Sequence, residues 1–491
     1  MNVMDSRVAV GRTAARRLSR YSSGDYDAPA RLLRRIFDEV CLDEKTSARV
    51  AHLIDEWFDT RRAAVDSRSV KMLLWRGRVD EAVSVIAEGP GSWLDSAAWI
   101  RFWYPDLGVP PSGGQVEVVT GLEGLDVLNA LLGEHDERAA VRHAQQVLRH
   151  CPMGEGALES LTSALITLVY AGRADLAARW CVPLLEQTTT HCDPAWLGVF
   201  AAIQAEIHVR QGDPAQAERC AHAALTHLSL REWGVALSFP LASMVSAKLA
   251  LDKPEEAARY LAVPVPEATF QTPAGLHYRY ARGEYALATG APRAALDDFA
   301  ACGDAMARWG LDLPGIVPWR LGAARSYVDL GRPERACELV ADHLALLPPG
   351  PSKGRGAALT LRAAASPVQA RQALLEEAVE IFQVVRDQAG LAGALKALAS
   401  VNSQLGQAHR ARLFERRALT IERPGLDAEP GARELLSDAE RRVATLAAQG
   451  YTNRRIAEKL YVSVSTVEQH LTHIYRKLGI SRRLDLPARL D

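Results

Sequence analysis

The chain has 491 residues, of which 48% are apolar and 24% charged, and its 58 Lys and Arg almost balance its 59 Asp and Glu. This length allows two to four domains or one long repeat array, and the composition is that of a core-forming protein, which excludes a largely disordered chain. The net charge of -1 excludes a surface that is basic throughout, so positive charge for a nucleic-acid partner must be local.

Residues 1–25 are predicted to be a flexible N-terminus. This segment contains arginines but no apolar run of the kind found in secretory signals. No stretch approaches the ~18 apolar residues of a membrane span, and the longest candidate is Ala164–Tyr170. We therefore expect a cytoplasmic protein without membrane contact, which would be nucleoid-associated when bound to DNA. The seven cysteines are scattered without a C-x-x-C, so we expect neither disulfides nor a metal site.

A short pattern recurs through residues 26–423, in which a turn residue is followed five positions later by Ala, as in Gly172 and Ala177. Successive turn residues from 172 onward are 40, 40, 38 and 41 positions apart. The pattern predicts pairs of helices joined by a Gly in the left-handed conformation, and a Pro two residues after the turn fits the first turn of the second helix. The turn residues are Gly77, Gly133, Gly172, Gly212, Asp252, Gly290, Gly331, Ser366 and Gly406, and the prolines are Pro214, Pro254, Pro292 and Pro333.

The copy around Gly290 resembles the tetratricopeptide repeat, because Gly283, Ala295 and Phe299 fall at that family's offsets. The spacing between copies is longer than in that family, so we expect a tetratricopeptide-like α-solenoid with longer helices. Such an array presents a long concave face that binds a peptide, a protein or a small ligand. The alternative is a scaffold that only spaces and dimerises the other domain.

The densest aromatic patch lies within this array, just before a loop predicted at residues 105–120. It forms a candidate ligand pocket, and the alternative interpretation is a helix packed into the solenoid core. Its residues are Trp99, Phe102, Trp103 and Tyr104.

Residues 424–433 are predicted to be a linker, and residues 434–491 a separate helical domain. Ser437 and Glu440 form a capping box that begins the first helix. Thr452 can cap a short second helix, and Ser463 or Ser465 a longer third one. A three-residue turn with Ala457 at the crossing is typical of a DNA-binding helix-turn-helix.

From Leu436 to Leu490 the chain resembles the LuxR/GerE family of bacterial transcription regulators, through the motif GYTNRRIAEKLYVSVSTVEQHLTHIYRKLGISRR. The resemblance implies four helices, with the third in the major groove. The fold class expected for the chain is therefore all-α, a solenoid followed by a four-helix LuxR-type domain. Pro487 lies within the expected fourth helix, which puts dimerisation through that helix in doubt.

The resemblance assigns base contacts to Glu468, Gln469 and Thr472. Gln can bond bidentately to adenine, a carboxylate can accept from cytosine, and Thr can touch a thymine methyl group. For His470 the alternative is a packed histidine, and for Arg454 and Arg455 a solvated face. The residues assigned to the DNA backbone or to positioning are Asn453, Arg454, Arg455, Ser465, Thr466, His470, Arg476 and Lys477.

A LuxR-type domain behind a helical-repeat array resembles the C-terminal half of large ATP-binding, maltose-activator-like regulators. The G-x-x-x-x-G-K-[ST] loop of their NTPase is absent, and no βα alternation or catalytic constellation is found, so we expect no cofactor and no enzyme activity. The predicted function is transcription regulation, controlled by a ligand or partner in the solenoid. The expected partners are promoter DNA, RNA polymerase and a second copy, and an activator is favoured. The alternative is an interaction scaffold whose helix-turn-helix no longer binds DNA.

The charge is divided between the two parts. Residues 430–491 contain 11 Lys and Arg against 7 Asp and Glu, whereas the rest of the chain contains 47 against 52. The near-zero net charge is therefore the sum of a basic C-terminal domain and a mildly acidic remainder of the chain.

Overall fold

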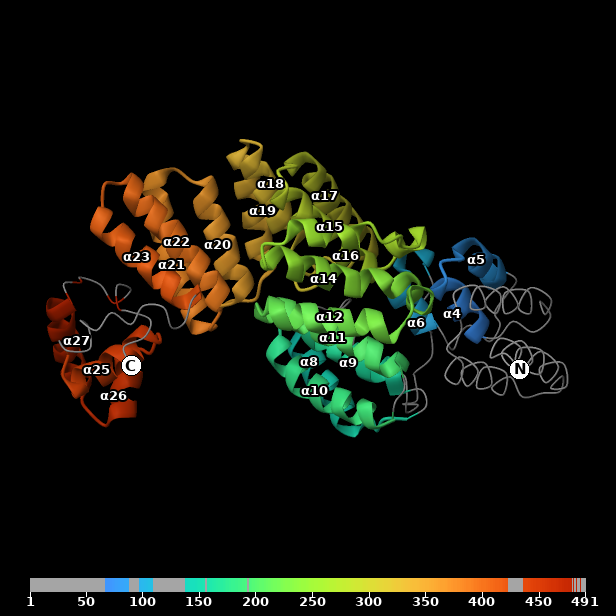
Figure 1. The fold of residues 1–491 in the computed structure, drawn as a ribbon, viewed down its shortest axis with the longest axis horizontal. Coiled ribbons are helices and arrows are strands. Elements are labelled where there is room, and N and C mark those ends of the chain that lie inside the picture. The colour runs from blue at the N-terminus through green and yellow to red at the C-terminus, as the bar shows by residue number, and fades with distance from the viewer. Residues whose placement is uncertain are drawn as a thin grey trace, which may run out of the picture. The chain divides into compact units, whose positions relative to one another are not determined.

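The computed structural model describes residues 67–87, 97–108, 137–154, 157–191, 194–422 and 436–478, together with Ile480, Arg483 and Leu486. Within these residues every regular element is a helix, which confirms the expected all-α class (Figure 1). The N-terminus 1–25, the Gly133 turn, the linker 424–433 and Pro487 with its expected fourth helix lie outside the described residues.

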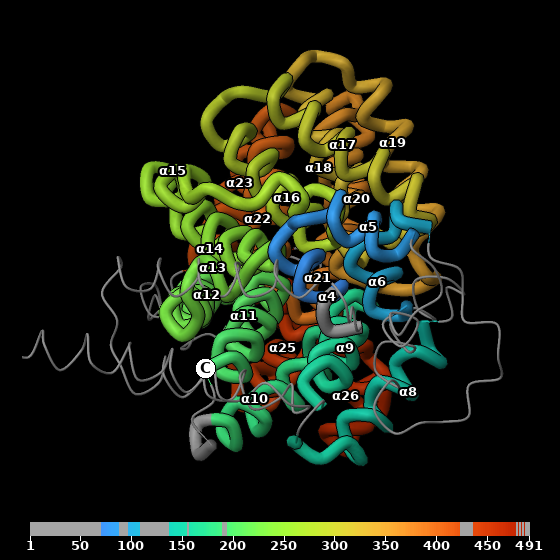
Figure 2. Tube along the Cα trace, turned by 90° about the vertical axis from the view of Figure 1, so that its right-hand side faces the viewer, coloured from blue at the N-terminus to red at the C-terminus, as the bar shows by residue number. Residues whose placement is uncertain are grey.

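Seven consecutive helix pairs form the described solenoid between residues 157 and 422, and each pair packs on the next (Figure 1). Figure 2 follows the same run from the green α10 to α12 through to the orange α20 to α23. The pairs are α9 (Ala157–Tyr170) with α10 (Ala174–His191), α11 (Pro194–Gln211) with α12 (Pro214–His227), α14 (Ser238–Ala250) with α15 (Pro254–Leu261), α16 (Pro273–Ala288) with α17 (Pro292–Trp309), α18 (Trp319–Asp329) with α19 (Pro333–Leu346), α20 (Lys353–Ala365) with α21 (Val368–Val384), and α22 (Gln388–Gln404) with α23 (Ala408–Glu422).

The predicted turn residues lie where the first helix of each pair ends. The backbone of Gly172 has φ +69° and that of Asp252 φ +58°, in the left-handed region that glycine adopts at least cost. Ser366 turns instead through an extended backbone. The four prolines each occupy the first residue of a second helix, and the recurrent Ala side chains are buried against the first helix. The repeat pattern in the sequence therefore reflects two structural requirements, the left-handed turn and the close approach of the two helices.

Phe299 explains why small residues recur on the first helices. A Cβ added at Gly283 in α16 would lie 2.7 Å from its ring, and one added at Gly322 in α18 would lie 2.6 Å from it. The Phe299 ring in α17 therefore fills the space next to Gly283 in α16 and Gly322 in α18, the first helices of two successive pairs. Close packing of this kind joins each pair to the next.

The aromatic patch lies on α6 (Ala97–Trp103) and the residue after it. The side chains of Trp99, Phe102 and Tyr104 are buried, and Trp103 is half-buried with its ring centroid 5.1 Å from that of Trp75 in α4 (Ser67–Trp75). The Tyr104 hydroxyl donates a 2.6 Å hydrogen bond to the Leu74 carbonyl, and burial raises its pKa well above the usual range. This geometry is that of the alternative interpretation, a packed core.

One segment of the described chain, Leu230–Ala250, is long and apolar enough to cross a membrane, although the sequence analysis found no such stretch. Ser238 and Ser243 interrupt its apolar runs. A search for continuous apolar residues therefore does not detect this segment, although its mean hydropathy is high. However, 78% of its 18-residue window is buried inside the solenoid. Burial of this extent identifies the segment, which comprises α13 (Leu230–Trp233), η3 (Gly234–Leu237) and α14, as a core element.

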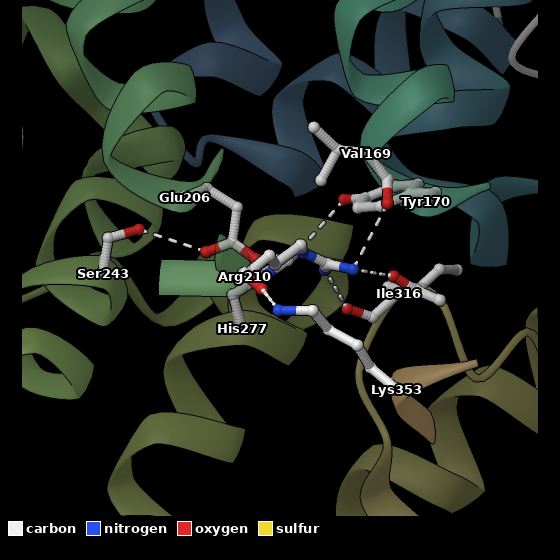
Figure 3. Close-up of polar contacts among 9 residues, drawn as sticks. Val169, Tyr170, Glu206, Arg210, Ser243, His277, Ile316 and Lys353 are labelled. Atoms are coloured by element: carbon white, nitrogen blue, oxygen red, sulfur yellow. Dashed lines mark hydrogen bonds and ion pairs between the residues drawn. The ribbon is translucent and has the colours of Figure 1, made fainter. Parts of the chain in front are cut away.

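Arg210, at the end of α11, connects parts of the solenoid that are far apart in the sequence (Figure 3). Its guanidinium group donates to the carbonyls of Gly315 at 2.6 Å and Ile316 at 2.8 Å, in the segment between α17 and α18. It also donates to the Val169 carbonyl at 3.3 Å and pairs with Glu206 at 2.7 Å. Residues 315 and 316 are thereby held against α9 and α11, which belong to two other repeats.

A buried polar cluster surrounds this ion pair (Figure 3). The Ser243 hydroxyl donates to Glu206 at 3.2 Å, and the imidazole of His277 lies 3.0 Å from the Tyr170 hydroxyl and 3.7 Å from Glu206. Burial lowers the pKa of His277 to about 4, against the opposing effect of Glu206. Burial would raise the pKa of Glu206, but its contacts with Arg210, His277 and Ser243 outweigh that effect and lower it.

Candidate nucleic-acid interface

The C-terminal helices begin at the predicted capping box. In α25 (Asp438–Ala448), the Glu440 amide donates to the Ser437 hydroxyl at 3.4 Å, and the Ser437 amide donates to the Glu440 carboxylate at 2.8 Å. The same carboxylate accepts a 2.6 Å bond from the Lys477 ammonium group. The Lys477 bond and the Ser437 amide lower the pKa of Glu440 to about 2. Glu440 therefore remains ionised and joins α25 to the far end of the third helix.

The second helix, α26 (Asn453–Leu460), is capped as predicted, because the Arg455 amide donates to the Thr452 hydroxyl at 3.4 Å. Ile456 and Ala457 are buried in the core of this domain. A short turn leads to α27 (Val464–Leu478), which Ser463 caps through a 3.0 Å bond from the Thr466 amide. Of the two caps that the sequence allowed, Ser463 is the one used.

Helix α27 separates its residues into two faces. Val467, Leu471 and Ile474 are buried against α25 and α26. The opposite face is exposed at spacings of three and four residues, which places its members on one side of the helix. The exposed residues on this side of the helix are Ser465, Glu468, Gln469, Thr472, His473 and Arg476, and we refer to them as the reading face.

The three expected base-contacting residues all lie on the reading face. Glu468 and Gln469 present a carboxylate and a carboxamide to solvent. The Thr472 hydroxyl donates to the Glu468 carbonyl at 2.9 Å, so its hydrogen is already used within the helix. Thr472 can therefore offer its methyl group or an oxygen lone pair to a base, which suits a thymine methyl contact.

Arg454 and Arg455 are the most accessible of the expected backbone-contacting residues in α26. The Arg454 side chain is 87% exposed and lies 3.7 Å from Glu458, a loose pair of the kind that contributes little to stability. Arg455 is exposed as well. Two exposed guanidinium groups beside a recognition helix are suited to phosphate oxygens.

Residues 434–488 match the family described as bacterial regulatory proteins, luxR family. The same segment is similar to the oxygen regulatory protein NreC of Staphylococcus aureus strains JH9, JH1 and Mu3. Each is 51% identical over 53 residues, which cover 11% of this chain and 24% of the relative. The aligned part is thus about a quarter of the length of these relatives.

The C-terminal segment is a luxR-type helix-turn-helix domain. Both the fold of α25 to α27 and the family match support DNA binding by this segment.

Other expected backbone contacts in the luxR-type domain are engaged within the protein. The Asn453 side-chain oxygen accepts a 2.5 Å bond from Arg483, which also donates to the Tyr451 carbonyl. The Thr466 hydroxyl is 2.8 Å from that of Ser463. Asn453, Thr466 and Lys477 each contact another residue of the domain, and Lys477 remains exposed. Arg476 is exposed as well, and His470 is half-buried.

Three residues of the domain that the structure draws attention to are not among the candidate site residues from the sequence. Arg483 and His473 both lie within the quoted motif, and the exposed face of the helix would have identified His473. Arg483 contacts a residue 30 positions away, so no local pattern indicates its role. The third residue is Tyr461, in the turn between α26 and α27.

Proposed function

We propose that the chain is a sequence-specific, DNA-binding transcription regulator whose helical repeats receive a ligand or partner protein and control the luxR-type domain. In this proposal residues 26–423 are the input part, 424–433 the linker and 434–491 the reader. The reading face of α27 carries the proposal, because an exposed carboxylate, carboxamide and hydroxyl follow one another on a helix flanked by arginines. These groups match the donors and acceptors of base edges and the charge of phosphates.

We propose an input surface on the repeats outside the aromatic patch. A ligand at Trp99 or Tyr104 would have to displace rings that pack on one another and a hydroxyl that is already bonded. The remaining parts of the proposal, an activator that acts as a homodimer and contacts RNA polymerase, rest on the resemblance of the reader to LuxR-type regulators.

The first experiment is selection of bound duplexes from a randomised pool by the full-length chain, followed by footprinting of the selected sequence. We expect a single protected motif, and a loss of about 1–3 kcal/mol of binding free energy for each base pair of the motif that is changed. A chain that enriches no motif, and binds selected and scrambled duplexes equally, would instead be the interaction scaffold. Addition of candidate ligands to the same binding reaction then tests the input part separately.

A further inference from the structure

Tyr461, in the turn between α26 and α27, has two unusual properties. Its side chain is 96% exposed, the highest value among the large apolar residues of the described chain. Its backbone has φ +55°, in the left-handed region. Only two other residues with a Cβ share that conformation within the described ranges, Asp252 and Arg386, and both lie in turns between solenoid helices.

The fold of the turn does not require a tyrosine side chain at this position. A left-handed residue at the end of a helix is most often Gly, because a Cβ raises the energy of this conformation. The hydrogen bond that closes α26 uses the Tyr461 amide and the Ala457 carbonyl, which any residue other than Pro could make. A fully exposed aromatic ring buries no apolar surface. A bulky residue in a strained, exposed position indicates a role in binding.

The surroundings of Tyr461 indicate which partner it meets. Residues 461–465 are all exposed, so accessible residues lead along the chain from Tyr461 to Ser465, the first member of the reading face. The exposed Lys459 precedes Tyr461, and the exposed Arg454 and Arg455 lie on the same helix α26. This charge favours an anionic partner over an apolar protein surface.

The dimensions of DNA complete the argument. A helix with its side chains is ~10–12 Å across, and the major groove is ~12 Å wide, so a recognition helix fills the groove. A long side chain that projects from the turn before such a helix meets the wall of the groove, which is the sugar–phosphate backbone. Tyrosine hydroxyls donate hydrogen bonds to phosphate oxygens in many complexes.

We propose that Tyr461 contacts the sugar–phosphate backbone at the edge of the major groove, with its hydroxyl on a phosphate oxygen and its ring on the adjacent sugar. This inference rests on the proposed function and extends its interface beyond the reading face. Tyr461 increases affinity for DNA of any sequence, at a cost in the stability of the helix-turn-helix.

The test measures affinity and stability in the same variants of the full-length chain. Tyr461→Gly lowers affinity for the selected duplex by about tenfold, and Tyr461→Phe, which loses one hydrogen bond, by about fivefold. Both variants lose affinity for a scrambled duplex by the same factors. Hydrogen exchange of the α26 and α27 amides is slower in Tyr461→Gly than in the original chain, because the strain is relieved.

Asp252→Gly is the matched control, since it relieves the same backbone conformation in the solenoid. It leaves DNA affinity unchanged, and its loss of an acidic group cannot imitate a loss of binding. In ethylation interference, Tyr461→Phe abolishes the signal at one phosphate.

The inference alone is overturned if Tyr461→Gly leaves DNA affinity unchanged while Arg454→Ala with Arg455→Ala still weakens binding. In that case the exposed Tyr461 side chain would instead contact a protein partner. Absence of binding by the original chain overturns the proposed function as well. Faster exchange in Tyr461→Gly overturns the inference too, because Tyr461 would then be structural.

Discussion

The ammonium group of Lys477 lies 2.6 Å from the carboxylate of Glu440, and this contact joins the last turn of the recognition helix to the first turn of α25. Glu440 also completes the capping box with Ser437. One carboxylate thus fixes both the start of one helix and the end of another. The orientation of the reading face depends on it.

Glu440→Gln is expected to weaken the luxR-type domain by about 1–2 kcal/mol, because the ion pair is lost and the capping box is left with a neutral amide. Hydrogen exchange of the α25 and α27 amides in the full-length chain measures this change. Asp438→Asn is the control, since Asp438 is 89% exposed and its pair with Arg441 contributes little. Equal effects of the two substitutions would contradict the role given to Glu440.

Gln469→Ala is expected to relax the sequence preference at one base pair by about 1–3 kcal/mol while binding to scrambled DNA stays unchanged. The reason is that Gln469 lies on the reading face and its carboxamide is exposed. A repeated selection from the randomised pool with the variant gives the measurement. A selected motif identical to that of the original chain would remove Gln469 from the interface.

The helix caps and turns of this chain could be predicted from the sequence, whereas contacts between residues far apart in the sequence could not. The Ser437 capping box and the Gly172 turn depend on residues within five positions of each other, so their patterns are visible in the sequence. The resemblance left open whether Asn453 contacts DNA or positions the helix, and no local pattern shows its bond to Arg483, which is 30 residues away. Arg210 shows the same limit in the solenoid, since Gly315 is 105 residues away.

Gly315→Ala is expected to destabilise the solenoid by several kcal/mol. An added Cβ would lie 1.7 Å from the Tyr170 carbonyl oxygen, so the segment held by Arg210 would have to move. Gly393→Ala in α22 is the matched control, because its Cβ meets nothing within 4 Å and Ala favours a helix by about 0.5–1 kcal/mol. Urea unfolding, followed by the fluorescence of the ten Trp residues, should give opposite signs for the two variants. A neutral Gly315→Ala would contradict the packing described here.

The solenoid is expected to lose stability as the pH falls from about 6.5 towards 4. His277 has a folded-state pKa of about 4, whereas an unfolded His has one of about 6.5, so protons bind preferentially to the unfolded chain in this window. His343, whose pKa burial also lowers to about 4, contributes with the same sign. Above pH 6.5 both groups are neutral in either state and the effect ends.

His277→Gln should therefore reduce the difference between the urea midpoints at pH 7 and pH 5, as followed by Trp fluorescence. His222→Gln, at an exposed position in α12, should leave that difference unchanged. A pH dependence that is the same in both variants would show that His277 is not buried in its neutral form.

The most direct test of the central claim is the salt dependence of binding of the full-length chain to its selected duplex. Each phosphate contact contributes about 0.9 to the slope of log affinity against log salt concentration. The original chain should show a steep negative slope, and Arg454→Ala with Arg455→Ala should reduce its magnitude by about 2 without changing the selected sequence. Binding that is insensitive to salt, or a slope that is unaltered in the double variant, would contradict DNA recognition through this interface.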